Sequence, residues 1–234
     1  MVMARCISKA RSTGADMKKL KVAVLISGRG SNMGSLARAA MDPDYPVEIV
    51  LVLSNKPHVG GLELAQEHGL SIQVVDQKAY DSRDDHDRAV TEALQASGAE
   101  LICLAGYMRI LGDAFVNSWR GRLINIHPSL LPSFIGLDTH ARALERGVRI
   151  HGCTVHFVNN ELDAGPIIAQ AAVPVVPGDS EESLAARVLE AEHKLYPHAL
   201  RLIAEQKVRW TGDQAVRDMN AAAEDVAIMG DGGA

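Results

Sequence analysis

The residues of this sequence that could do chemistry together are an amide, an imidazole and a carboxylate. Asn125 and His127 stand two apart at the end of the apolar run 123–126, and Asp163 follows in a polar segment further along the chain. If the run is a strand, residues two apart point to the same face, so one strand end presents an amide donor beside an imidazole. Such a pair can hold an oxyanion while a proton moves. The carboxylate can orient the imidazole or collect the proton.

The alternative interpretation of these residues is a capped turn. Pro128 and Pro132 indicate that a turn follows the strand, and the three residues alone leave both interpretations open. A metal site is not predicted, because the histidines lack His-Glu-x-x-His spacing and the cysteines are isolated. A serine hydrolase is not predicted either, because no Gly-x-Ser-x-Gly elbow is present.

Length and composition limit the classes of protein to consider. The chain has 234 residues, 47% hydrophobic residues and a net charge of −5, which suits one sizeable α/β domain or two small ones. This charge gives no reason to expect a nucleic-acid or membrane partner. The three cysteines have no paired spacing, so we expect a reducing, cytoplasmic setting. Residues 1–18 are expected to form a disordered extension and residues 211–234 a flexible tail.

The pattern of apolar runs predicts an α/β fold with a doubly wound, mostly parallel sheet. Buried-type strands are expected at 21–27, 47–53, 72–75, 100–105 and 123–126, with helices at about 31–41, 60–68 and 82–98. The runs 153–158 and 167–176 predict an antiparallel pair appended to the sheet. Ser180 begins a long C-terminal helix, and Pro197 is expected to kink it or to start a new segment. One domain, 19–210, therefore holds all predicted elements.

Three further segments are candidates for ligand binding. The loop 28–32 joins a strand to a helix that Ser31 or Asn32 could cap, and its backbone could hold an anion. It is not a dinucleotide fingerprint, because Met33 replaces the third glycine. Arg83 could reach a phosphate, although a solvated surface arginine is the alternative. The segment 104–111 could line a slot for a flat heterocycle or belong to the core.

Taken together, these segments resemble a known family. The sequences at 28–32, 54–56, 105–111, 125–132, 152–158, 161–167 and 178–180 are similar to those of phosphoribosylglycinamide formyltransferases, within the folate-dependent formyltransferase superfamily. The resemblance covers roughly residues 21–210. It implies a Rossmann-like formyltransferase fold and an enzyme of purine biosynthesis that uses 10-formyltetrahydrofolate as co-substrate and no metal.

The resemblance implies a transfer of the formyl group from 10-formyltetrahydrofolate to the amine of glycinamide ribonucleotide. Asn125 would donate a hydrogen bond to the formyl oxygen. His127 would stabilise the oxyanion or shuttle the proton, and Asp163 would orient His127 and relay the proton. The rival activities are hydrolysis of formyltetrahydrofolate, in which water replaces the amine, and a non-catalytic folate- or nucleotide-binding role on the same fold. The phosphate site argues against the first rival and the intact catalytic set against the second.

The resemblance also implies where the two substrates bind. In the half 19–120, the ribonucleotide phosphate would meet Gly30, Ser31, Asn32 and Arg83. Glu192 would meet the ribose. The folate slot would be lined by Met108, Arg109, Ile110, Leu111, Asn159, Asn160 and Glu161, partly from the catalytic half 121–210. His140 would lie near the site, and Asp138, where many relatives carry His, would add negative charge near His127. A homodimer is an arrangement that the resemblance allows.

Overall fold

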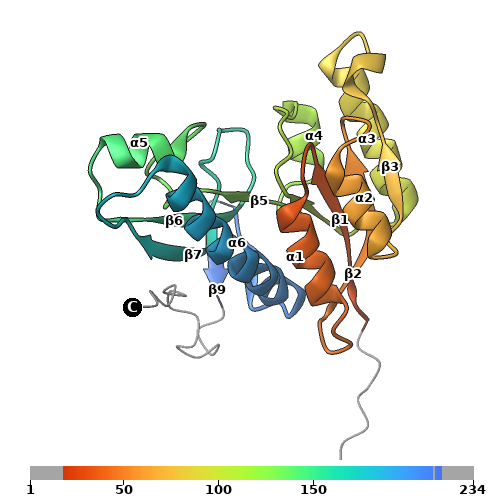
Figure 1. Ribbon diagram of the computed structural model, residues 1–234. Helices are drawn as coiled ribbons and strands as arrows, with labels where there is room; N and C mark the ends of the chain where they lie inside the picture. The colour runs from red at the N-terminus through yellow and green to blue at the C-terminus, as the bar shows by residue number, and fades with distance from the viewer. Residues whose placement is uncertain (1–17, 213, 218–234) are drawn as a thin grey trace, which may run out of the picture.

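A computed structural model describes residues 18–212 and 214–217 of the chain. Seven strands form one sheet in the order β3-β2-β1-β4-β5-β6-β7, which crosses the centre of the molecule in Figure 1. The strands from β3 to β5 are parallel, and β6 and β7 are antiparallel to their neighbours. Their bounds are β1 Leu20–Ile26, β2 Val47–Ser54, β3 Ile72–Val74, β4 Leu101–Leu104, β5 Leu123–His127, β6 Ile150–Phe157 and β7 Ile167–Pro174. The predicted α/β class, with an antiparallel pair after a parallel sheet, is confirmed.

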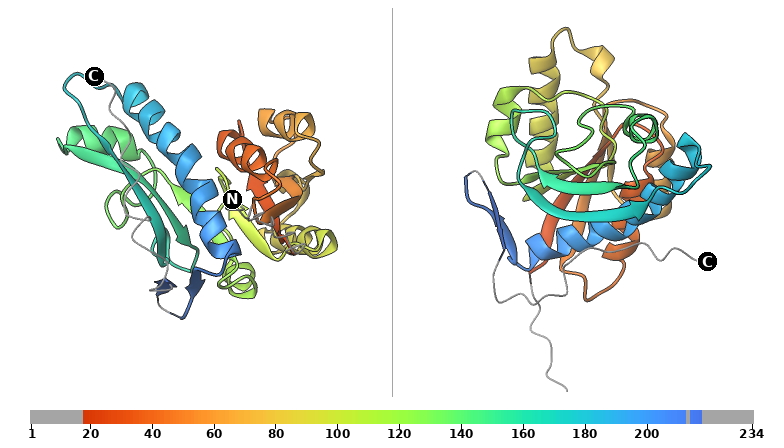
Figure 2. Two further views of the ribbon diagram at one scale, coloured as in Figure 1. Left: turned by 90° about the horizontal axis from the view of Figure 1, so that it is seen from below. Right: turned by 90° about the vertical axis from the view of Figure 1, so that its left-hand side faces the viewer.

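Helices cover both faces of the sheet. One face packs against α1 Ser31–Ala40, α2 Gly60–Glu67 and α6 Glu181–Ala204, with α5 Thr139–Glu145 beside α6. The other face packs against α3 Arg83–Ser97 and α4 Asp113–Ser118. Figure 1 and the view from below in Figure 2 show α6 running between α1 and the strands β6 and β7. The long helix therefore joins the two halves of the sheet.

The two apolar cores follow directly from the pattern of the central strand. In β1, Val22, Val24 and Ile26 belong to the core under α1 and α6, whereas Ala23 and Leu25 belong to the core under α3. Alternate residues of a strand point to opposite faces, so a continuous apolar run is what a strand covered on both faces requires. The parallel strands could be predicted correctly because their apolar runs are continuous.

The expected cap of α1 was wrong, and so was one of the two outcomes expected at Pro197. Neither Ser31 nor Asn32 caps α1: the N-cap is Gly30, with φ of 73° and no side-chain cap hydrogen bond. Glycine reaches this left-handed conformation without the strain of a Cβ atom, and it brings the chain close to Gly61. Pro197 does not start a new segment, because α6 continues through it to Ala204. Buried residues on both sides of the proline, such as Leu195 and Leu200, hold the helix together.

Several elements have no counterpart in the prediction. These are the short helices α4 and α5, the 3₁₀ turn Gln77–Ala79 and the hairpin of β8 Val208–Trp210 with β9 Ala215–Arg217. The hairpin corrects the expected tail, since β9 lies inside the segment 211–234. Residues 218–234 and the extension 1–17 lie outside the described residues. Lys18, at the end of the expected extension, pairs with Glu100 at 2.9 Å. None of the helices in the described ranges has the length and apolar character needed to cross a membrane.

Candidate active site

The last residues of β5 place Asn125 and His127 on one face of the sheet. Their neighbours Ile124 and Ile126 point into the core beneath α6, so Asn125 and His127 point to the opposite face. His127 is 6% exposed and ends the strand. The segment after it turns through Pro128 to Gly136 before α5. The prediction that one strand end presents both side chains is confirmed.

The loop between β6 and β7 brings Asp163 to this face. One carboxylate oxygen, Oδ2, lies 3.5 Å from Nδ1 of His127 and accepts the backbone N–H of Gly136 at 2.9 Å. Asp163 has a φ of 52°, a left-handed conformation that is uncommon away from glycine. The carboxylate therefore ties the turn after β5 to the loop after β6. Asn125, His127 and Asp163 are brought together as the sequence predicted.

The hydrogen bond of the His127 ring to Phe134 determines which ring nitrogen carries a proton, and so how the ring meets Asp163. Nε2 lies 3.0 Å from the carbonyl oxygen of Phe134, and a carbonyl oxygen only accepts, so Nε2 carries a proton. In a neutral ring Nδ1 then presents a lone pair to the carboxylate of Asp163. The contact becomes attractive when the two side chains share one further proton. The turn that follows β5 thus fixes the tautomer of His127 and turns Nδ1 toward Asp163.

A fourth side chain, His156, belongs to the site and was not predicted. It lies opposite Asn125 in the antiparallel pairing of β5 with β6, and directly opposed residues share a face. Its Nδ1 lies 2.8 Å from the carbonyl oxygen of Phe157 and must donate. Nε2 is therefore the acceptor for the Asn125 amide, whose Nδ2 lies 3.3 Å away. Burial lowers the pKa of His156, which favours the neutral ring that this bond needs.

The sequence carried only part of the signal for His156. The run 153–158 was correctly predicted as a strand, and its alternation puts Thr154 and His156 on one face. Which residue of β5 each one faces depends on the register between the strands, and register is fixed by pairing in the folded sheet. The amide of Asn125 is oriented by this register.

Glu192 and Asn32 meet between α1 and α6, on the other face of the sheet. Asn32 Nδ2 donates to Glu192 Oε2 at 2.6 Å, and burial raises the pKa of Glu192 to about 7. Oδ1 of Asn32 is buried and has no hydrogen-bond partner among the described residues. The loop through Gly30 and Ser31 opens directly onto the first turn of α1, where backbone N–H groups are free to bind an anion. Asn32 and Glu192 are thus in contact, with Gly30 and Ser31 at the start of the same helix as Asn32. That these residues bind the ribonucleotide stays a prediction.

Arg83 does not join this cluster. It begins α3, which covers the opposite face of the sheet from α1, and its Nε lies 3.7 Å from where a Cβ would stand on Gly112. Arg83 is therefore beside the loop 105–112, which was expected to line the folate slot. Arg83 is the first residue of α3, so its position depends on which face of the sheet this helix covers.

The loop after β4 and the loop after β6, which carries Asp163, expose apolar side chains. Met108 is 61% exposed, Ile110 73% and Leu162 63%. Asn159 accepts the N–H of Glu161 through its side chain at 3.1 Å, which shapes the loop without using the exposed groups. Leu111 is partly buried against the core beneath α3. These loops offer an apolar surface with polar backbone edges, the character of a small-molecule site.

His140 and Asp138 lie on the turn and helix that follow His127. The ring of His140 packs edge-to-face on His151, with centroids 5.3 Å apart, and burial lowers the pKa of both histidines, His151 to about 4. Asp138 is exposed and is the N-cap of α5. The carboxylate that faces His127 is that of Asp163. The expected influence of Asp138 on His127 therefore has no contact to support it among the described residues.

Comparison with known proteins identifies the family. The family described as formyl transferase matches residues 20–200. The chain belongs to the formyl transferase family. It is 41% identical over 212 residues to phosphoribosylglycinamide formyltransferase of Escherichia coli, covering 88% of this chain and 100% of that protein. It is also similar to a solved structure, glycinamide ribonucleotide transformylase 1 from Symbiobacterium toebii, with 41% identity, a TM-score of 0.84 and coverage of 90% and 99%.

A formyl transferase of this kind also occurs within longer proteins. The chain is 53% identical over 191 residues to the trifunctional purine biosynthetic protein adenosine-3 of Gallus gallus, covering 82% of this chain. It spans only 19% of the length of that relative. The resemblance seen in the sequence is thus confirmed at the level of the family. The Asn125, His127 and Asp163 group lies inside the matched segment 20–200.

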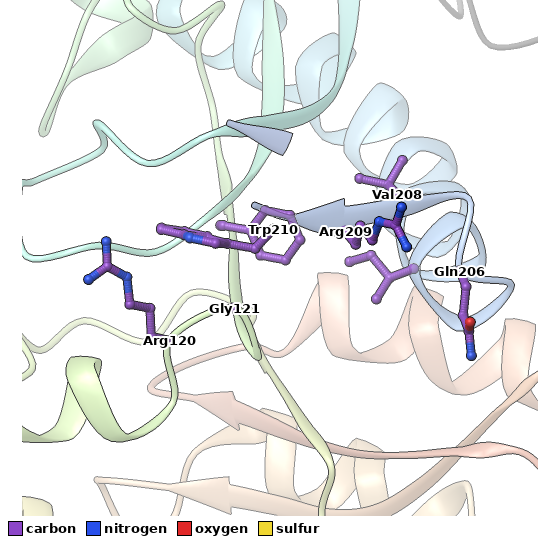
Figure 3. A pocket seen from close by; sticks show the side chains of 8 residues that line it. Arg120, Gly121, Gln206, Val208, Arg209 and Trp210 are labelled. Carbon is purple, nitrogen blue, oxygen red and sulfur yellow. The ribbon is translucent and has the colours of Figure 1, made fainter. Parts of the chain in front are cut away.

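A cavity of about 410 Å³ lies away from the catalytic group, beneath the hairpin of β8 and β9 (Figure 3). Trp210 forms its centre: the ring of Phe157 meets it edge-to-face at 5.4 Å, and the Arg120 guanidinium lies 5.5 Å from its centroid. These contacts pack the hairpin against the end of β6 and the turn that precedes β5. Trp210 stands just before the expected tail 211–234, and its strand β8 pairs with β9, which lies inside that tail.

Proposed function

We propose that this formyl transferase is a cytoplasmic enzyme of purine synthesis. It would move the formyl group of 10-formyltetrahydrofolate to the amine of glycinamide ribonucleotide, giving formylglycinamide ribonucleotide and tetrahydrofolate. The observation that carries the proposal is the arrangement of Asn125, His127 and Asp163, whose carboxylate lies 3.5 Å from the imidazole. The names of the relatives support the choice of substrates.

In the proposed reaction the amine nitrogen attacks the formyl carbon and the carbonyl electrons move to oxygen. The free N–H of the Asn125 amide, whose other N–H is held by His156, donates to this oxyanion. As the carbon–N10 bond breaks, a proton leaves the amine and one reaches N10 of the folate. His127 and Asp163 hold and pass this proton between them. Positioning and a preformed oxyanion site are enough for a reaction of this type.

The two substrates would approach from opposite sides of the catalytic group. Gly30, Ser31 and Asn32 would take the phosphate, with Glu192 accepting from the ribose hydroxyls. Met108 to Leu111 and the segment 159–161 would line the folate slot. For Arg83 the position beside Gly112 favours an anionic group of the folate over the ribonucleotide phosphate, and we revise its assignment accordingly.

The deciding experiment follows the absorbance of 10-formyltetrahydrofolate with and without glycinamide ribonucleotide. Turnover only in the presence of the ribonucleotide would support the proposal. Turnover with water alone would indicate a hydrolase instead, and folate binding without turnover would indicate a binding protein. The variant His127→Ala is expected to bind folate but to lose transfer, and retained transfer in this variant would contradict the assigned role of His127.

A further inference from the structure

The loop 105–112, between β4 and α4, is held at two points that lie on either side of an exposed apolar residue. The N–H of Met108 donates to Ser27 Oγ at 2.8 Å, and the N–H of Gly112 donates to Asp87 Oδ2 at 2.7 Å. Between these bonds stands Ile110, 73% exposed. The loop therefore presents an apolar side chain to solvent while its backbone is fixed from below.

Asp87, which holds the end of the loop at Gly112, is a buried carboxylate. It is 5% exposed and comes from α3, not from the loop itself. Its second oxygen, Oδ1, lies 3.8 Å from Arg109 Nε and 3.6 Å from His86 Nδ1. A buried carboxylate is costly unless it is paired and hydrogen-bonded. The loop supplies one hydrogen bond to this carboxylate, from Gly112 to Oδ2. Oδ1 has no hydrogen-bond partner among the described residues and faces the Arg109 guanidinium at ion-pair distance.

The other side of Arg109 is held by a chain of polar side chains. Ser27 Oγ donates to Asn55 at 2.6 Å, and Asn55 Nδ2 donates to Gln77 Oε1 at 2.8 Å. Gln77 Oε1 also accepts from Arg109 Nη1 at 3.4 Å. The chain begins at the hydroxyl that receives the Met108 N–H. Arg109 is thus fixed between Gln77 and Asp87, and the loop is anchored to β1, β2 and α3 together.

We propose that Asp87 is a positioning residue for folate, which sets the loop 108–112 in its binding conformation before the ligand arrives. This inference rests on the proposed function, since it assumes that the loop lines the folate slot. A loop that is ordered in the free protein loses less entropy on binding than one that the ligand must order. Without Asp87, the entropy of ordering the loop is lost when folate binds. Folate affinity then falls, while the ribonucleotide cluster at Asn32 is untouched.

The test compares Asp87→Ala and Asp87→Asn with the matched control Glu92→Gln. Glu92 is an exposed carboxylate on the same helix, so its variant loses the same charge without touching the loop. Asp87→Ala removes both the acceptor of the Gly112 N–H and the charge facing Arg109, so it is expected to raise the KM for 10-formyltetrahydrofolate about tenfold. The KM for glycinamide ribonucleotide and kcat should stay within about twofold of wild type. Asp87→Asn keeps an acceptor for Gly112 but not the charge facing Arg109, and it should give an intermediate KM.

Calorimetric titration with tetrahydrofolate separates this inference from the proposed function. A wild-type chain that neither binds tetrahydrofolate nor transfers formyl groups would overturn the function itself. A wild-type chain that transfers normally, with unchanged tetrahydrofolate affinity in the Asp87 variants, would overturn only the positioning role. An equal rise in both KM values would also overturn it, since that is the signature of general damage to the fold. If Asp87→Ala does not fold, the same readouts on Asp87→Asn decide.

Discussion

At the scale of single residues, hydrogen-bond donors and acceptors determine how the side chains of the proposed catalytic site are oriented. The carbonyl oxygens of Phe134 and Phe157 each fix a proton on one nitrogen of a histidine, His127 and His156 respectively. The remaining nitrogens therefore face Asp163 and Asn125 with defined roles. Two backbone carbonyls thus determine how an amide and a carboxylate are used. This gives each of the polar side chains a separate and testable task.

The variant Asp163→Asn is expected to lower kcat by about a hundredfold or more, since it removes the group that shares a proton with His127. The amide can still accept the N–H of Gly136, so the midpoint of thermal unfolding should change little. Steady-state transfer rates and thermal unfolding measured on the same preparation check both statements. Asp138→Asn is the matched control, because Asp138 is exposed and the ion-pair contact of His127 is with Asp163. A larger loss of kcat in Asp138→Asn than in Asp163→Asn would contradict the assignment.

His156→Leu is expected to lower kcat on the order of tenfold with little change in either KM, because a misdirected oxyanion donor loses much of its effect. The leucine leaves the Asn125 amide without its acceptor, so the amide is free to turn. His156→Gln restores an acceptor oxygen and should recover part of the rate. Steady-state kinetics of the two variants provide the comparison. Equal rates in both would show that His156 contributes only packing.

At the scale of elements, the sequence predicted the strands that form continuous apolar runs. It missed the features that depend on how the strands pair and on which face of the sheet a helix covers. The strands through Val24 and Val52 were predicted because burial on both faces demands long apolar runs. The helices α4 and α5 have six and seven residues, too few for a periodic pattern to emerge. Asn125 and His127 could be placed together because two residues on one strand define a face. The position of His156 could not be predicted, because it depends on the register between β5 and β6. The position of Arg83 could not be predicted, because it depends on which face of the sheet α3 covers.

The loop that carries Asp163 is set by the close approach of Gly165 to β6. A Cβ atom at this position would collide with the carbonyl oxygen of Phe157 and would stand 2.8 Å from its carbonyl carbon. Gly165→Ala is therefore expected to lower the free energy of unfolding by about 1–3 kcal/mol. It should also lower kcat, because Asp163 is only two residues away.

Gly60→Ala is the control for this substitution, since nothing lies within 4 Å of its added Cβ and it opens α2. Its free energy of unfolding should stay within about 0.5 kcal/mol of wild type. Denaturant unfolding and transfer rates measured on both variants test whether the close approach of Gly165 to β6 is needed for stability and for activity. Wild-type stability and rate in Gly165→Ala would show that the loop can move away from β6 without cost to the site.

At the scale of the whole molecule, α6 connects the two halves of the sheet and carries Glu192 of the proposed ribonucleotide site. Tyr196 Oη donates to the carbonyl oxygen of Leu104 at 3.0 Å, at the junction of β4 and β5. One turn earlier, Glu192 reaches Asn32 of α1. The same helix thus supports the core and presents a buried carboxylate to the proposed ribose site. Stability and binding are linked through this carboxylate.

The link predicts a dependence of stability on pH. Burial raises the pKa of Glu192 from 4.5 to about 7, so the unfolded chain ionises first as pH rises. The stabilising contribution is complete below about pH 4.5 and is lost as pH rises toward 7, by roughly 3 kcal/mol in all. Glu192→Gln removes this loss. Its free energy of unfolding, relative to wild type, should therefore increase between pH 4.5 and 8.

Denaturant unfolding at pH 4.5, 6 and 8 measures this difference, and Glu190→Gln, an exposed position on the same helix, is the control. Burial raises the pKa of the nearby Cys153 thiol and Tyr196 phenol. Both groups therefore stay neutral between pH 4.5 and 8 and do not contribute to the pH dependence of the difference. A difference that does not vary with pH would show that Glu192 is not desolvated. Glu192→Gln should also raise the KM for glycinamide ribonucleotide. A gain in stability at pH 8 together with weaker ribonucleotide binding would show that the carboxylate is kept for the ligand, at a cost to the fold.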